Sequence, residues 1–226
     1  MAKENMDDRW GFETRAIHAG QKPDPQTGAI TVPVYQTTTY EQDEVGKDRG
    51  YEYSRTGNPT RDALEVSVAA LEGAEYGRAF ASGMAAEDTI LRLLNPGDHI
   101  VMGNDAYGGT FRLISKVLTR MGVTWSAADL SKKDNIENCL TDKTRIIWAE
   151  TPSNPLLSVV DIQMLSQVSH SIGALCVVDN TFATPYLQQP LTHGADFVVH
   201  SATKYLGGHS DVVGGFIATN SPELDQ

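Results

Sequence analysis

Short apolar runs alternate with amphipathic stretches along most of this chain, and this alternation constrains its fold more than any other feature. The apolar runs, which are candidate strands, occupy residues 79–82, 99–103, 144–150, 174–180, 196–201 and 214–218. Between them, apolar residues recur at helical spacing over residues 83–94, 110–122 and 161–173. Strands that alternate with helices predict a parallel α/β sheet. Because the runs are almost wholly apolar, we expect helices to cover both faces of that sheet.

The N-terminal part has a different composition. Residues 1–60 show little apolar periodicity and are rich in turn-forming residues, threonine and tyrosine, which predicts an extended arm. A helix is predicted next, with Thr60 as its N-cap and Gly73 at its end. We therefore expect an arm over residues 1–60 and an α/β domain over residues 61–226. An apolar run lies close to residue 226, so we also expect this domain to be truncated.

Composition and charge exclude several classes of function. The 226 residues are 40% hydrophobic and carry a net charge of -11, without a cluster of lysine and arginine that could follow a nucleic-acid backbone. The sequence contains no run of about eighteen apolar residues that could span a membrane, and its N-terminus lacks the apolar core of a signal peptide. We expect a cytoplasmic protein that binds neither nucleic acid nor membrane. Cys139 and Cys176 have no metal-ligand spacing, and Cys176 is expected to be a buried, reduced thiol.

Lys204 is the strongest candidate for a catalytic residue. It lies in the segment HSATKYLGGHSD, directly after an apolar run. A lysine at the end of a strand can reach into a cleft and form a Schiff base with a carbonyl cofactor such as pyridoxal phosphate. Asp179 ends the preceding apolar run in LCVVDNTF. Since the strand ends of a doubly wound sheet share one edge, Lys204 and Asp179 are expected to face the same crevice, with Asp179 against the pyridinium nitrogen.

The other requirements of this cofactor have candidates as well. Ser82, Gly83 and Met84 lie at a predicted junction between a strand and a helix, where free backbone N–H groups and the helix dipole favour phosphate. Ser201 and Thr203 add hydroxyl groups from the segment of the lysine. These five residues predict a phosphate site.

Three further residues complete the predicted site. Tyr107, in NDAYGGT, could stack on the cofactor ring. Arg55 could close the phosphate pocket with charge-assisted hydrogen bonds, and Tyr53 could share that task. We expect no metal site, because the spacing of the histidines fits no helical pair of ligands. A rival is the S-x-x-K pattern of Ser201 to Lys204, which matches penicillin-binding serine acyltransferases, but the companion K-T-G and S-D-N elements are absent.

Several long motifs resemble one known family. YEYSRTGNPTRDALE, FASGMAA, NDAYGGTFR, ETPSNPLLSVVDI, VVDNTFATPYLQQPL and HSATKYLGGHSDVVGG are similar to motifs of the Cys/Met-metabolism pyridoxal-phosphate enzymes. The resemblance runs from about residue 10 to the last apolar run. It is closest to the cystathionine γ-synthases and the related γ-lyases. It implies the large domain of the fold type I transferases that depend on pyridoxal phosphate, with the C-terminal small domain and its substrate-binding arginine missing.

The resemblance also implies roles for the residues of the site. Lys204 would be the Schiff-base lysine and a proton shuttle that Tyr107 could assist, and Asn154 would approach the phenolic oxygen of the cofactor. Tyr53 and Arg55 would reach the phosphate pocket of a neighbouring subunit, which implies a homodimer that usually pairs into a tetramer. Gly109 stands where methionine γ-lyases have a cysteine, which disfavours that activity.

The expected reaction is γ-replacement, which forms cystathionine from an O-acylhomoserine and cysteine, as in methionine biosynthesis and transsulfuration. The alternatives are a cystathionine γ-lyase or an O-acetylhomoserine sulfhydrylase. An alternative of another class is a fragment that binds the cofactor and is catalytically silent.

Overall fold

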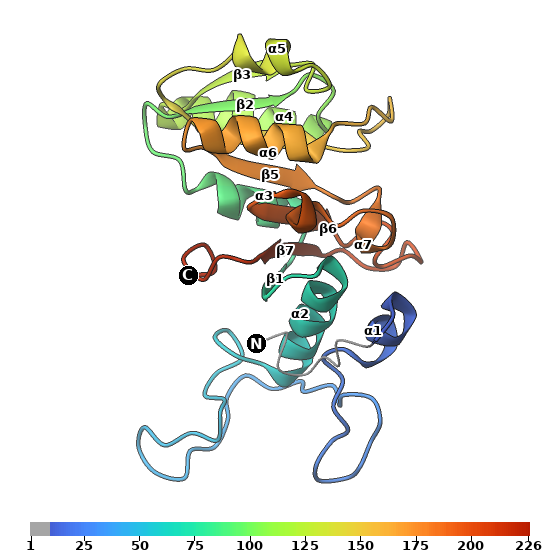
Figure 1. Cartoon of the computed structure of the whole chain (residues 1–226). Helices are drawn as coiled ribbons and strands as arrows, with labels where there is room; N and C mark the ends of the chain where they lie inside the picture. Colours follow the sequence, from blue (N-terminus) through green and yellow to red (C-terminus); the bar gives the residue numbers. More distant parts are fainter. Residues whose placement is uncertain (1–9) are drawn as a thin grey trace. The chain divides into compact units, whose positions relative to one another are not determined.

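The computed structural model describes residues 10–226, which divide into two compact units. The first unit ends at Gly77, and the second runs from Arg78 to Gln226. Figure 1 shows the chain coloured along its sequence. Each unit is described by itself, beginning with the first.

The first unit contains helices α1 (Phe12–His18) and α2 (Pro59–Glu72). The prediction of Thr60 as the N-cap of α2 was wrong, because Asn58 caps the helix. The Asn58 side chain accepts hydrogen bonds from the backbone N–H groups of Thr60 (2.9 Å) and Arg61 (3.4 Å). Pro59 follows as the first helical residue, a position where its missing N–H costs nothing. The predicted end at Gly73 is confirmed, since this glycine has the left-handed conformation (φ 69°) that commonly ends helices.

The rest of residues 10–58 consists of turns and two isolated antiparallel bridges, Thr39 with Tyr53 and Glu44 with Lys47. The sequence did not predict α1, which lies in the segment interpreted as an extended arm. The hydroxyl of Thr60 joins this segment to α2. It accepts a hydrogen bond from the Tyr35 N–H (2.9 Å) and donates one to the Pro33 carbonyl (3.1 Å).

The second unit is built on a sheet whose strands follow the order β1-β7-β6-β5-β4-β2-β3, of which β1 begins two residues before that unit starts. The bounds of the strands are Tyr76–Phe80 (β1), His99–Gly103 (β2), Thr124–Ala128 (β3), Thr144–Glu150 (β4), Leu175–Asp179 (β5), Phe197–Ser201 (β6) and Gly215–Thr219 (β7). The pairs β2–β3, β2–β4, β4–β5 and β5–β6 are parallel, and β6–β7 is antiparallel. The predicted α/β fold with a mostly parallel sheet is confirmed. Strand β3 was missed because it is an edge strand and has a single buried residue.

Helices connect these strands. Their bounds are Gly83–Leu91 (α3), Gly108–Arg112 (α4), Leu113–Val117 (the π-helix η2), Leu118–Met121 (the 3₁₀-helix η3), Lys133–Glu137 (α5), Ile162–Ser171 (α6), Thr184–Leu187 (α7) and Pro190–His193 (the 3₁₀-helix η4). The helix predicted over residues 110–122 is present as a continuous helical segment, which passes from α-helix (α4) through π-helix (η2) to 3₁₀-helix (η3). No helix within residues 10–226 is long and apolar enough to cross a membrane.

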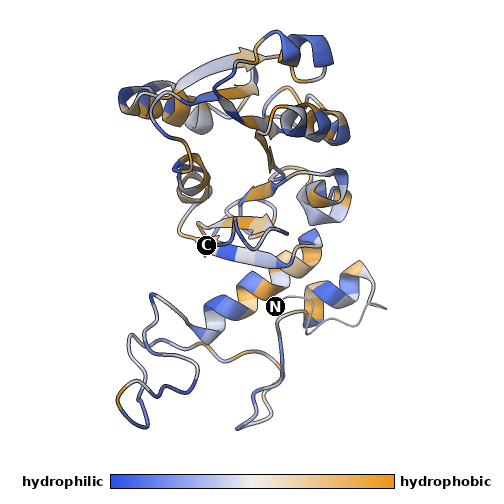
Figure 2. Cartoon of the chain, turned by 60° about the vertical axis from the view of Figure 1, so that its left-hand side comes forward, coloured by the Kyte–Doolittle hydropathy of each residue, from blue (hydrophilic) through white to orange (hydrophobic). Residues whose placement is uncertain are grey.

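Two hydrophobic clusters lie on opposite faces of the sheet. Successive residues of β4 alternate between them, so that Trp148 belongs to one cluster and Ile147 to the other. Helix α3 and the stretch from α4 to η3 contribute to the cluster of Trp148, and α5 and α6 contribute to the other. Figure 2 shows hydrophilic and hydrophobic residues mixed along the helices that flank the sheet, as expected for amphipathic helices. The predicted coverage of both faces is confirmed, and Cys176 is fully buried as expected.

This strand order creates a crevice outside the carboxyl ends of the strands. The connection from β2 to β3 runs over one face, whereas the connection from β4 to β5 runs over the other, although β2 and β4 are neighbours. The loops that leave β2 and β4 therefore diverge. In parallel sheets, ligands bind in the crevice outside the carboxyl ends of the strands at such a switch point.

Candidate active site

A cavity of about 240 Å³ lies at the carboxyl ends of these strands, within the second unit. Nine of the predicted site residues line it, and they are Ser82, Gly83, Met84, Tyr107, Asn154, Asp179, Ser201, Thr203 and Lys204. They come from segments far apart in the sequence. Tyr53 and Arg55 belong to the first unit, where the Arg55 guanidinium carbon lies 4.7 Å from the centre of the Tyr53 ring. The structure does not place these two residues at the cavity, and their role stays a prediction.

Lys204 reaches the cavity from a tight turn after β6. Its backbone N–H donates to the Ser201 carbonyl (3.1 Å), and its own carbonyl accepts from the Gly208 N–H (2.8 Å). Gly207 makes this turn possible, because a Cβ atom there would lie 2.8 Å from the Ala202 carbonyl oxygen. The turn therefore fixes the Lys204 backbone and leaves its side chain at the cavity wall.

Asp179, the last residue of β5, supplies a buried carboxyl group. One of its oxygens accepts a hydrogen bond from the Thr181 N–H (2.9 Å), and the residue is only 7% exposed. Burial raises the pKa of Asp179, while hydrogen bonds from Thr181 and the nearby His200 act in the opposite direction. A cationic group bound against this carboxylate would compensate for its lost hydration. Asp179 thus suits a positively charged ring nitrogen.

The start of helix α3 lines the same cavity as Lys204 and offers groups that could hold an anion. The Ser82 hydroxyl accepts a hydrogen bond from the Ala85 N–H (3.1 Å) and caps the helix. Gly83 and Met84 are the first two residues of the helix, so their N–H groups have no intrahelical acceptor. A Cβ atom on Gly83 would lie 2.8 Å from the Cβ of Ser201. Only glycine allows the two segments to approach this closely, so the N–H groups and the Ser201 hydroxyl lie at one end of the cavity.

Tyr107 forms an aromatic wall of the cavity. Its backbone N–H donates to the Glu150 carboxylate (2.7 Å) at the end of β4, and the residue remains 43% exposed. A Cβ atom on Gly109 would lie 2.4 Å from a Tyr107 ring atom and 2.7 Å from the Met84 sulfur. The ring therefore lies over Gly109 and close to Met84. A side chain at position 109 would displace it.

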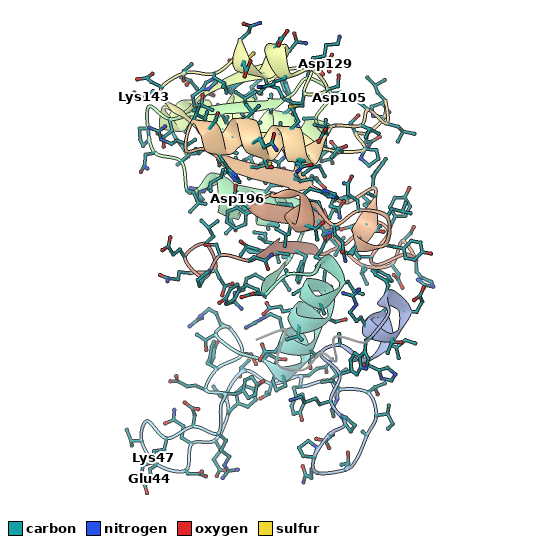
Figure 3. The ribbon with its side chains drawn as sticks, viewed as in Figure 1. Glu44, Lys47, Asp105, Asp129, Lys143 and Asp196 are labelled. Atoms are coloured by element: carbon teal, nitrogen blue, oxygen red, sulfur yellow. The ribbon has the colours of Figure 1, made fainter. Side chains whose placement is uncertain are left out.

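The loops after β2 and β4 are joined by hydrogen bonds close in sequence to the lining residues Tyr107 and Asn154. The Ser153 hydroxyl donates to Asp105 (2.5 Å), which is labelled in Figure 3. The Ser153 hydroxyl also accepts from the Ser158 N–H (3.1 Å). These bonds hold the segment that carries Asn154 against the segment that carries Tyr107.

Sequence reasoning missed four lining residues, which are Glu87, Glu150, Thr181 and Phe182. The pKa of Glu87 is raised to about 8 and that of Glu150 to about 7. Burial is the largest cause of both shifts, and the charge of Asp179 adds to each. Glu150 could have been found, because it ends a predicted strand as Asp179 does. Glu87 follows Gly83 by four residues, so the helical period alone places it on the face that Gly83 presents to Ser201.

The fold and the cavity together define a class of protein. One cavity at the switch point of an α/β sheet brings together a lysine amine, a buried carboxyl group, the start of a helix and an aromatic ring. Pyridoxal phosphate requires this set of groups, for its aldehyde, ring nitrogen, phosphate and ring face respectively. The residues present fit that cofactor.

Comparison with known proteins agrees with this class. The Cys/Met metabolism PLP-dependent enzyme family matches residues 13–226, and the chain belongs to this family. The chain is 57% identical over 218 residues to the cystathionine gamma-synthase of Mycobacterium tuberculosis, with 96% of the chain and 56% of that protein covered. It is 55% identical over 213 residues to the cystathionine beta-lyase of Lactococcus lactis subsp. cremoris, with 94% and 56% covered.

The fold is also similar to that of a solved relative. The crystal structure of cystathionine gamma-lyase from Lactobacillus plantarum, complexed with L-serine, matches with a TM-score of 0.92 at 49% identity. The match covers 95% of this chain and 56% of that one. The chain thus spans about half the length of the relatives that it matches.

Proposed function

We propose that the cavity of the second unit binds pyridoxal phosphate, with Lys204 as its covalent ligand. The convergence of Lys204, Asp179 and the start of α3 on one cavity carries this proposal. Bound pyridoxal phosphate supplies an electron-accepting ring that takes up charge from an amino-acid substrate. Asp179 keeps the ring nitrogen protonated, and this keeps the ring a strong acceptor.

The remaining residues hold and orient the cofactor. The N–H groups of Gly83 and Met84, with the hydroxyls of Ser201 and Thr203, bind the phosphate, and Ser82 supports them as the helix cap. Tyr107 would stack on the ring, and Asn154 would approach its phenolic oxygen. The Lys204 amine would carry protons between the α and β carbons of the substrate.

We propose γ-replacement as the reaction of the whole protein, with cystathionine formed from an O-acylhomoserine and cysteine. The relative called cystathionine gamma-synthase, at 57% identity, supports this choice. Tyr53 and Arg55 are proposed to act at the phosphate site of a second copy, in a homodimer that pairs into a tetramer.

Cleavage of cystathionine or related substrates is the second candidate. It is favoured by the 55% identity to a cystathionine beta-lyase and by the similarity to the gamma-lyase structure. An O-acetylhomoserine sulfhydrylase would use the same cofactor residues. Incubation of the protein with O-acylhomoserine plus cysteine or sulfide, and with cystathionine alone, separates these reactions by their products. A chain that retains the cofactor but forms none of these products is the remaining alternative, since the chain spans only about half of its relatives.

The experiment that tests cofactor binding is borohydride reduction of the chain with pyridoxal phosphate, followed by peptide mass spectrometry. We expect the pyridoxyl label on Lys204, with loss of the label and of the visible absorption band in Lys204→Ala. Lys143→Ala is the matched control, because Lys143 is an exposed lysine beside Asp142 and lies outside the cavity. A label spread over surface lysines, or one that survives in Lys204→Ala, would refute the assignment.

A further inference from the structure

A buried hydrogen bond joins helices α3 and α4 next to the cavity. The Thr110 hydroxyl donates to Glu87 Oε2 over 2.7 Å. Glu87 is 3% exposed and Thr110 is 1% exposed, so water does not compete for either group. Such a bond is costly to break, because both partners would be left buried without each other.

Both ends of this bond are tied to the cavity. Glu87 lines the cavity one helical turn beyond Gly83. Thr110 lies in the first turn of α4, directly after Tyr107 and Gly108–Gly109. The Phe111 N–H donates to the Tyr107 carbonyl (2.9 Å), so this turn and the tyrosine backbone move together.

The Tyr107 ring lies where the two helices meet. A Cβ atom on Gly109, in α4, would touch both the ring and the sulfur of Met84, which belongs to α3. The separation of α3 and α4 therefore sets where the ring can lie. The hydrogen bond from Thr110 to Glu87 links the two helices and so helps to fix that separation.

We infer that Glu87 is a positioning residue that holds Tyr107, through Thr110, in place as the aromatic wall of the cavity. The inference deepens the proposed function, on which it rests for the identity of the cofactor.

The charges around Glu87 fit this role. Asp179 from β5 and Glu150 from β4 face it with carboxyl groups, and His200 from β6 lies near Asp179. With a pKa of about 8, Glu87 is mostly protonated at neutral pH. A neutral carboxyl group still accepts the Thr110 hydrogen bond through its carbonyl oxygen. It does so without placing a further negative charge beside Asp179.

Two pairs of variants separate the hydrogen bond from the rest of the side chain. Glu87→Gln keeps an acceptor for Thr110, and Glu87→Leu removes it at similar size. Thr110→Ser keeps the donor, and Thr110→Val removes it. Asp88→Asn and Thr89→Val are matched controls on α3, because Asp88 pairs with Arg92 and Thr89 donates to the Ala85 carbonyl, both outside the cavity.

Two readouts are measured on the full chain. Absorbance titration gives the affinity for pyridoxal phosphate, and hydrogen exchange without the cofactor reports the opening of residues 107–112. We expect Glu87→Leu and Thr110→Val each to weaken the affinity about tenfold and to speed exchange in residues 107–112. The Gln, Ser and control variants should stay within about twofold of the parent chain. The double variant Glu87→Leu/Thr110→Val should be no worse than either single variant.

Three results would overturn the inference. The first is a Gln variant as impaired as the Leu variant, and the second is a folded Thr110→Val variant with unchanged exchange in residues 107–112. The third is hydrogen exchange that speeds up as much throughout the second unit as it does in residues 107–112, which would indicate general destabilisation by the Leu and Val variants. If the parent chain binds no pyridoxal phosphate, the proposed function fails for this chain. The exchange pattern still decides whether Glu87 positions Tyr107.

Discussion

Replacement of Glu87 by glutamine should make the stability of the second unit less sensitive to pH. In the folded chain, burial and the charge of Asp179 raise the pKa of Glu87 from 4.5 to about 8. Between these two pH values, the folded state holds a proton that the unfolded state has released, so stability falls as the pH rises. The favourable contribution is fully present below about pH 4.5 and is lost as the pH rises through about 8.

The size of the effect follows from the displaced pKa. A difference from 4.5 to about 8, at about 1.4 kcal/mol per pH unit, gives a loss of about 4 kcal/mol between pH 5 and pH 9. Glutamine cannot ionise and still accepts the Thr110 hydrogen bond, so Glu87→Gln should lack this loss. Relative to the parent chain, Glu87→Gln should therefore gain about 4 kcal/mol in free energy of unfolding between pH 5 and pH 9. At pH 9 the variant should be the more stable of the two.

Urea denaturation followed by tryptophan fluorescence measures this difference. Trp148 is buried in the sheet core and Trp125 is half-buried on β3, so both report on the second unit. Asp88→Asn serves as the control for loss of an acidic side chain from the same helix. Parallel stability curves for the parent chain and Glu87→Gln between pH 5 and pH 9 would refute the reasoning, because Glu87 would then ionise as freely as in water.

Three further predictions concern single residues. Asp179→Asn removes the proposed partner of the ring nitrogen and should lower turnover by the full-length protein at least about 100-fold, while borohydride labelling of Lys204 persists. Turnover near that of the parent would contradict the proposed role. Gly83→Ala places a methyl group against Ser201 and should weaken pyridoxal phosphate binding at least about tenfold in a titration. Gly108→Ala is the control and should not weaken binding, because its methyl group would contact only the end of the flexible Arg112 side chain. Asn58→Ala removes the cap of α2 and should lower the free energy of unfolding by about 1 kcal/mol in urea; an unchanged midpoint would show that the cap contributes nothing.

The sequence predicted the sheet well because its central strands are buried on both faces. Strands β2 and β4 have the predicted bounds, since burial of nearly every residue on both faces requires a mostly apolar run. The edge strand β3 escaped prediction, because a half-exposed strand has no such requirement. The N-cap of α2 was misplaced by two residues, because Asn58 and Thr60 are both good caps and the intervening proline decides between them.

The candidate site was predictable where it depends on strand ends. Asp179 and Ser201 end apolar runs and Lys204 follows one, and a parallel sheet brings such positions together at the carboxyl ends of its strands. Glu87 does not follow a strand, and an acidic residue inside an amphipathic helix is normally solvated, so only its helical spacing from Gly83 pointed to this face. Its burial and its hydrogen bond with Thr110 are tertiary features, which helical spacing does not reveal.

The strand order determines when the cavity can form as the chain is synthesised. Its lining residues follow β1, β2, β4, β5 and β6 and extend from Ser82 to Lys204, so no short stretch of chain contains even half of the cavity. During synthesis the turn proposed to bind the phosphate emerges long before Lys204, and the proposed cofactor site is complete only once β6 has joined the sheet. Occupancy by the cofactor is therefore a late event that reports completed assembly of the sheet. The bound cofactor then stabilises the assembled state by mass action, because the unfolded chain offers it no comparable site.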